Sequence, residues 1–259
     1  AMQQPSLLTR VAVRWIELST QRRCMISSTP NSLTRRHLLK TAAFSAALLA
    51  TTTLTRYAMA DEAATGPFDF DSFTERMKAM AATAYVPPAA ALPEAYAGLT
   101  YDGYRMVQFN PAKAKWADAK LGYQVHAFAL GWLFKEPVSV SEVVGSDAHT
   151  IGFETDDFRF YDAGMKAKAE AEPFPGVAGM RINYPLNKPD VADELVSFVG
   201  ASYFRALGRD NIYGLSARGL LINSWREGPE EFPRFSEFYL EKPASESDPL
   251  TIYAALESQ

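Results

Sequence analysis

Short runs of β-branched, aromatic and aliphatic residues follow one another from residue 99 almost to the end of this chain. The segments between them carry Gly, Pro, Asn and Asp, the residues that turns require. No repeat with a period of about 20–50 residues is present, which argues against a propeller or a solenoid. The pattern therefore predicts an all-β fold, an antiparallel β-sandwich. The expected strands are Leu99–Phe109, Leu121–Phe134, Val138–Val144, His149–Glu154, Asp157–Tyr161, Gly179–Tyr184, Val196–Ala206, Tyr213–Asn223, Phe235–Glu241 and Leu250–Leu256.

One short helix is expected before these strands. Ser72–Glu75 has the S-x-x-E pattern of a capping box, and apolar residues follow at helical spacing as far as Ala84. Pro87 then ends the helix, because the residue before a proline is pushed out of the helical region. Two later stretches leave alternatives open. Lys166–Glu172 is compatible with a helical turn but is interpreted as an exposed loop, and Asp190–Leu195 is compatible with a helical turn.

The stretch Val196–Ser224 predicts a hairpin, because two apolar-rich runs flank Gly208–Asn211. Arg218 lies in the second run between apolar neighbours. Such a charge must reach water, a carboxylate or a ligand, because burying it alone is very costly. Flat or forked polar side chains recur within this hairpin and just after it, which suits a face that holds a polyhydroxylated ligand. They are Tyr203, Arg205, Tyr213, Arg218 and Trp225.

The first sixty residues have the pattern of an export signal. Arg35 and Arg36 precede a weakly apolar run, and Ala58-Met59-Ala60 forms a small-x-small cleavage site. This order predicts a twin-arginine signal peptide that sends a folded protein to the periplasm through the twin-arginine export machinery. A membrane-spanning helix is disfavoured, because the apolar run is too short to cross a bilayer. Residues upstream of Met25 are extra to an already complete signal, so residues 1–60 are expected to lie outside the fold.

Composition narrows the class of partner. Eight of the 26 basic residues but one of the 30 acidic residues lie in the first sixty, so residues 61–259 carry 18 against 29, a net charge of −11. Such a surface repels phosphate groups, which argues against binding nucleic acid or anionic lipid. No G-x-G-x-x-G or phosphate-binding loop occurs, and no cofactor is expected. Asp147 and His149 lack the further ligands that a transition metal needs, so no metal site is expected.

Three motifs in this order resemble the periplasmic glucans biosynthesis proteins, types G and D. They are GASYFRALG over 200–208, YGLSARGLLIN over 213–223 and EEFPRFSEFYLEKP over 230–243. The resemblance runs from about Phe68 to the last residue. Type D is preferred, because its members resemble this chain in carrying a twin-arginine signal. The resemblance implies a large β-sandwich of the galactose-mutarotase type, followed by an immunoglobulin-like domain. Family members continue well beyond Gln259, so residues 61–259 are interpreted as the N-terminal part of the sandwich, which ends on an unpaired strand.

The resemblance also implies a role in making osmoregulated periplasmic glucans, by binding and processing the β-glucan backbone, and a functional link to the inner-membrane glucan synthase. Some members cleave β-1,2-glucan, but their catalytic carboxyls are expected beyond residue 259, so no catalytic residue is assigned. G-L-S-A-R-G over 214–219 is not a nucleophile elbow, because its second glycine comes one residue late. Two alternatives remain open: a non-catalytic glucan-binding scaffold, and a mutarotase-like sugar epimerase.

Sugar binding uses aromatic faces against the apolar side of a pyranose ring and polar groups aimed at its hydroxyls. For any one aromatic residue, a core or strand-pairing role is the commoner outcome, and Glu231 is equally explained by an ion pair with Arg218 or Arg234. The candidate ligand-binding residues are Tyr101, Tyr104, Arg105, Tyr203, Arg205, Tyr213, Arg218, Trp225 and Glu231.

Overall fold

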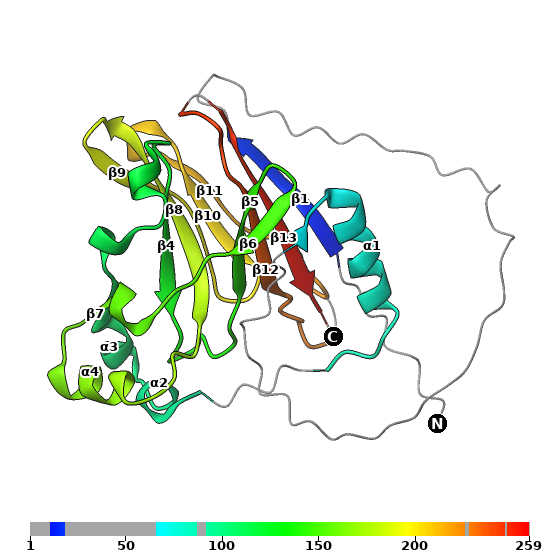
Figure 1. Cartoon of the computed structure of the whole chain (residues 1–259). Helices are drawn as coiled ribbons and strands as arrows, with labels where there is room; N and C mark the ends of the chain where they lie inside the picture. The colour runs from blue at the N-terminus through cyan, green and yellow to red at the C-terminus, as the bar shows by residue number, and fades with distance from the viewer. Residues whose placement is uncertain (1–10, 19–65, 87–91, 226–227, 247, 259) are drawn as a thin grey trace, which may run out of the picture.

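Two β-sheets pack face to face in the computed structural model, which describes residues 11–18, 66–86, 92–225, 228–246 and 248–258 (Figure 1). The first sheet has the strand order β1-β13-β12-β5-β6-β2 and the second β11-β10-β9-β8-β4. A small third sheet pairs β3 (Val107–Phe109) with β7 (Phe158–Phe160). The predicted β-sandwich is confirmed.

The six-stranded sheet is antiparallel except where β12 runs parallel to β5. Its strands are β1 (Val11–Leu18), β2 (Gly66–Pro67), β5 (Ser139–Val144), β6 (Asp147–Thr150), β12 (Arg234–Glu241) and β13 (Leu250–Glu257). Residues 11–18, which were expected outside the fold, lie beside β13 as β1. Strand β13 therefore has a partner at each edge, which corrects the expectation of an unpaired final strand.

The five-stranded sheet is antiparallel throughout. Its strands are β4 (Gln124–Ala129), β8 (Val177–Lys188), β9 (Val191–Val199), β10 (Tyr203–Leu207) and β11 (Tyr213–Arg218). The predicted hairpin is confirmed as β10 and β11. The expected strand Val196–Ala206 is in fact two strands, because Gly200 takes a φ of +76° and turns the chain between β9 and β10.

The core lies between the two large sheets. Phe198 of β9 meets Phe235 and Phe238 of β12, with ring centroids 5.5 and 5.2 Å apart. Met180 and Leu240 are fully buried among them. A fully buried side chain of this size stabilises the fold by about 1.5–3 kcal/mol. Burial of one face of the five-stranded sheet leaves the opposite face of that sheet as a platform for polar side chains.

Helix α1 (Phe70–Ala81) covers the outer side of the six-stranded sheet (Figure 1). Phe73 and Met77 are buried there against Tyr239 and its neighbours. The helix begins earlier than the capping-box pattern indicated, because Asp69 and not Ser72 is the N-cap. The Asp69 side chain accepts a hydrogen bond from the backbone N–H of Ser72, 2.9 Å away.

Two further local predictions are wrong, and side-chain capping explains both. Part of the expected strand Leu99–Phe109 is helix α3 (Tyr101–Arg105), because the Thr100 hydroxyl accepts from the N–H of Gly103. The stretch interpreted as an exposed loop is helix α4 (Ala163–Glu170), capped by Asp162. Asp190–Leu195 does not turn helically but belongs mostly to β9, since its backbone pairs with β8.

Short helical elements complete the described chain. Helix α2 (Glu94–Ala97) packs on α4, and four 3₁₀ turns connect the strands. The turns are η1 (Pro111–Lys113), η2 (Ala117–Ala119), η3 (Thr155–Asp157) and η4 (Arg209–Asn211). The expected strand His149–Glu154 is shorter than predicted, because β6 ends at Thr150. Of the helices in the described ranges, none combines the length and apolarity needed to cross a bilayer.

Candidate functional site

A row of polar side chains crosses the outer face of the five-stranded sheet. Cross-strand register aligns one residue from each strand, and we call this set the polar row. Its members are His126, Arg181, Ser197, Arg205 and Ser216. Because side chains alternate along a strand, the flanking residues Met180, Val196 and Phe204 point into the core instead. The sheet therefore presents one apolar and one polar face.

The carboxylate of Glu194 lies at the centre of this face. Arg205 donates to Oε1 of Glu194 through Nε, at 3.1 Å, and through Nη2, and the Ser197 hydroxyl donates to the same oxygen at 3.1 Å. Nη1 of Arg181 lies 3.8 Å from the other carboxylate oxygen. The Arg205 side chain is 42% exposed and that of Glu194 is 16% exposed. The cluster thus holds a fixed carboxylate and presents a guanidinium to solvent.

At the β4 end of the row, His126 is a buried neutral imidazole. Its ring stacks on Phe109 with centroids 4.9 Å apart. Burial, and secondarily the positive charge of Arg181, lowers the pKa of His126 to about 4. Burial also lowers the pKa of Arg181, although nearby Glu194 opposes that change. The His126 ring therefore acts as a hydrogen-bonding group at neutral pH and not as a cation.

At the opposite end, Tyr203 of β10 and Arg218 of β11 are direct cross-strand partners. The Arg218 guanidinium carbon lies 5.6 Å from the Tyr203 ring centroid and 5.5 Å from that of Phe232. Its Nη1 lies 2.6 Å from a carboxylate oxygen of Glu230. The sequence indicated that the charge of Arg218 must reach water, a carboxylate or a ligand, and in the structure it reaches a carboxylate and two aromatic rings. Tyr203 remains 45% exposed and available as a stacking surface.

The candidates on helix α3 form a separate group. The Tyr104 hydroxyl donates to the carbonyl of Ala129 at 3.0 Å, and burial raises the pKa of Tyr104. This residue is structural. Tyr101 and Arg105 are exposed, and the Arg105 guanidinium lies 5.7 Å from the Tyr101 ring centroid. The ring of Trp132, a residue that sequence reasoning did not single out, lies 5.1 Å from that of Tyr101.

The remaining candidates lie outside the polar row. Trp225 is fully exposed after β11 and takes a φ of +63°. Glu231 accepts a hydrogen bond from the Ser258 hydroxyl at the end of β13. The two arginines considered as its partners are paired elsewhere, Arg218 with Glu230 and Arg234 with Glu136 and Glu257. The side chain of Tyr213 and the signal residues Arg35, Arg36, Ala58 and Ala60 lie outside what the structure describes.

The structure brings three of the candidate ligand-binding residues together on one sheet face: Tyr203, Arg205 and Arg218. The sequence analysis singled out neither Arg181, His126 nor Glu194 as a ligand-binding residue. A usable signal was present, because Arg181 lies between Met180 and Ile182 in a strand, just as Arg218 lies between apolar neighbours. Within the described residues, no group of three His, Cys, Asp or Glu side chains is arranged to hold a metal ion.

The comparisons with known proteins all indicate the same family. A family model described as "Periplasmic glucan biosynthesis protein, MdoG" matches residues 68–259. Glucans biosynthesis protein G of Cereibacter sphaeroides is 47% identical over 196 residues, which cover 76% of this chain and 36% of that protein. The protein G of Rhodopseudomonas palustris is 42% identical over 195 residues, covering 74% and 38%. That of Bradyrhizobium diazoefficiens is 38% identical over 227 residues, covering 88% and 44%. The chain spans less than half the length of these relatives, all of which carry the type G name.

Proposed function

Because the chain belongs to the periplasmic glucan biosynthesis (MdoG) family, we propose that it binds the backbone of a β-glucan along the polar row. The observation that carries this proposal is the alignment of polar side chains across all five strands of one sheet face. Because His126 is buried, a ligand reaches the row from Arg181 to Ser216; neighbouring strands lie about 4.8 Å apart, so these three spacings extend over roughly 14 Å. A row of that length accommodates several sugar rings in line.

The chemistry of the row suits a neutral polyol. A glucan backbone offers hydroxyl groups, which both donate and accept, and apolar ring faces. The Arg205 guanidinium supplies donors and the exposed Ser216 hydroxyl both donates and accepts, while the exposed ring of Tyr203 supplies a face for stacking. Because Glu194 and Arg205 already hold each other in place, little side-chain order is lost when a ligand binds.

The same contacts favour binding over bond cleavage in this part of the protein. Glycoside hydrolysis needs two carboxyl groups that flank the scissile bond and remain available to the substrate. Glu194 is engaged by Arg205, Ser197 and Arg181, and Glu230 is engaged by Arg218. We therefore place any processing of the glucan, including β-1,2-glucan cleavage, in the whole protein, with its catalytic carboxyls beyond residue 259.

Localisation in the periplasm is part of this proposal. The family description names periplasmic proteins, and the twin-arginine pattern at Arg35 and Arg36 supplies a route of export. A protein that holds nascent glucan beside the inner-membrane glucan synthase would need both a periplasmic location and a route of export. The expected division into a signal over 1–60, a sandwich segment over 61–259 and a further immunoglobulin-like domain belongs to the same proposal.

Isothermal titration with linear β-glucans of different linkages tests the binding proposal. We expect the chain to bind a β-glucan of at least one linkage saturably. A parallel assay for new reducing ends tests catalysis, and it is expected to stay at background for residues 1–259. Saturable binding without cleavage supports a binding role, whereas the absence of binding to every linkage would contradict the proposal. Release of reducing ends would contradict the placement of the catalytic groups beyond residue 259.

A further inference from the structure

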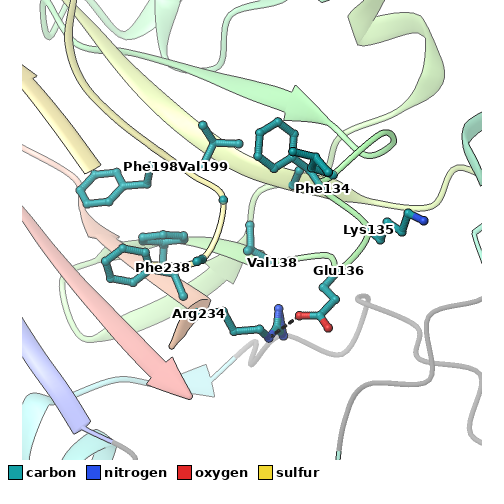
Figure 2. Close-up of a pocket in the computed structure, with 13 residues that line it drawn as sticks. Phe134, Lys135, Glu136, Val138, Phe198, Val199, Arg234 and Phe238 are labelled. Atoms are coloured by element: carbon teal, nitrogen blue, oxygen red, sulfur yellow. Dashed lines mark ion pairs between the residues drawn. The ribbon is translucent and has the colours of Figure 1, made fainter. Parts of the chain in front are cut away.

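A cavity lies beneath the turn between β9 and β10, the two strands that carry Ser197 and Arg205. Its volume is about 310 Å³. Figure 2 shows Phe198 and Phe238 on one side of it and Phe134 and Glu136 on another, with Val138 between them. The cavity therefore joins the end of the hydrophobic core to the 131–137 segment.

The walls of this cavity are aromatic because core residues reach it. Phe198 and Phe238 lie 5.2 Å apart between ring centroids and are almost fully buried. Phe134 approaches the turn closely, and a Cβ on Gly200 would lie 2.7 Å from its ring. Glycine at this position, with its φ of +76°, is thus what allows the Phe134 wall to close on the turn. Phe198 and Phe238 thus form a buried apolar floor, and the partly exposed ring of Phe134 is the aromatic side chain of the lining that can face a ring-shaped ligand.

Charged side chains surround the rim of the cavity, and their positive and negative charges cancel. Arg234 lies 3.2 Å from a carboxylate oxygen of Glu136 and 3.6 Å from one of Glu257, and it donates to the carbonyl of Pro137 at 3.2 Å. Lys135 adds one further positive charge at the exposed mouth. Two cations and two carboxylates sum to zero, and the carboxylate of Glu136 is 44% exposed at the rim. An anionic ligand would meet Glu136, so the site favours an uncharged ligand.

From these features we propose that the cavity is a second carbohydrate site, which holds a single uncharged pyranose ring. A volume of 310 Å³ is at the lower end of the range for ligand pockets, about 300–1,000 Å³, so it admits one ring and not a chain. The partly exposed ring of Phe134 contacts one face of the pyranose ring, while the exposed Glu136 carboxylate addresses its hydroxyls. That the ring is an end or a branch of a β-glucan rests on the function proposed above.

Chemical-shift mapping tests this site directly. Methyl β-D-glucopyranoside is titrated into the isotope-labelled chain, and the backbone amides of Val199, Gly200 and Ala201 are followed. We expect saturable chemical-shift changes centred on these three amides. The corresponding glucuronide, which carries a carboxylate, is expected to bind at least fivefold more weakly. Absence of saturable shifts at these amides, or tighter binding of the glucuronide, would overturn the proposal.

Variants separate this cavity from the polar row. Ala178 lines the cavity, so Ala178→Phe fills it and is expected to abolish the shifts, while Arg205→Ala is expected to leave them intact. If Ala178→Phe does not fold, Phe134→Leu serves instead, because it removes an aromatic wall from a partly exposed position. Unchanged monosaccharide binding in the folded cavity variant would refute the site. Shifts in the cavity without any binding of long glucans would remove the proposed function but keep this second site.

Discussion

Arg181 donates hydrogen bonds to Nδ1 of His126, which lies 3.2 Å from its Nη2 and 3.4 Å from its Nε. A ring nitrogen that accepts a hydrogen bond cannot carry a proton, so the proton of the neutral ring is on Nε2. Among the described residues, Nε2 of His126 is buried without a hydrogen-bond partner. The polar row therefore ends in a neutral donor, and protonation of His126 would place a second cation beside Arg181.

This arrangement predicts a pH dependence of stability. The pKa of His126 falls from 6.5 in the unfolded chain to about 4 in the folded protein, so the unfolded chain binds the proton more readily. The contribution of neutral His126 is fully present above pH 6.5 and is lost as the pH falls from 6.5 towards 4. Complete loss would lower the free energy of unfolding by up to about 3 kcal/mol, which denaturant titrations across this range would measure.

Two glutamine variants isolate that contribution. His126→Gln removes the titrating ring from the buried site, so its stability is expected to fall less steeply than that of the unaltered chain between pH 6.5 and 4. His149→Gln is the matched control, because His149 lies exposed on β6. The same pH profile for His126→Gln and the unaltered chain would refute the assignment.

Helix α1 is expected to depend on a forked ion pair. Nη1 and Nη2 of Arg76 lie 2.9 and 2.5 Å from the two carboxylate oxygens of Glu237, and the Tyr239 hydroxyl donates to the same carboxylate at 3.0 Å. Because Arg76 is 42% exposed, solvent weakens the pair, and Arg76→Ala is expected to cost about 1 kcal/mol of unfolding free energy. Lys78→Ala, which breaks an exposed pair with Glu75, should change it by less than about 0.5 kcal/mol. Equal losses of thermal stability in Arg76→Ala and Lys78→Ala would contradict the prediction that the Arg76–Glu237 pair contributes more than the Lys78–Glu75 pair.

The close approach of β8 and β9 at Gly179 predicts that a side chain at this position destabilises the fold. A Cβ on Gly179 would lie 2.1 Å from the carbonyl oxygen of Phe198, so Gly179→Ala must displace one strand. We expect a loss of at least about 2 kcal/mol in unfolding free energy. Gly66→Ala is the control, since its Cβ meets nothing within 4 Å. Similar melting temperatures for both variants would show that the strands are not packed as described.

Export is predicted to require both arginines of the signal pattern. Replacing Arg35 and Arg36 by lysine keeps the charge but removes the twin-arginine motif. The variant is expected to accumulate in the cytoplasm, as fractionation and immunoblotting would show. Unimpaired delivery of the double variant to the periplasm would refute the twin-arginine interpretation.

Much of the fold could be predicted, because alternating apolar and polar residues indicate strands and the turn residues between them mark where strands end. β4, β5, β8, β12 and β13 all lie within or around predicted runs. The helical errors have a common cause: α3 and α4 are short, and side-chain caps from Thr100 and Asp162 set their starts. Such caps depend on single side chains next to the helix, which a window of apolar periodicity does not detect.

The site was harder to predict, because it depends on register between strands that are distant in sequence. Within one hairpin, Tyr203 and Arg218 could be placed together from alternation alone. The pairing of Arg181 with His126, 55 residues apart, requires knowing that β4 and β8 are neighbours. The cavity beneath Gly200 was harder still to predict from the sequence, since it depends on how the 131–137 segment packs over the end of the core.

The most direct test of the central claim is the affinity of the Arg205→Ala chain for the β-glucan that the unaltered chain binds, measured by isothermal titration. We expect the Kd to rise at least tenfold, because Arg205 is the most exposed guanidinium of the row. Lys78→Ala is the control, since Lys78 is exposed on α1, which covers the six-stranded sheet, and the Kd of this variant should be unchanged. A folded Arg205→Ala chain that binds the glucan as tightly as the unaltered chain would contradict the account.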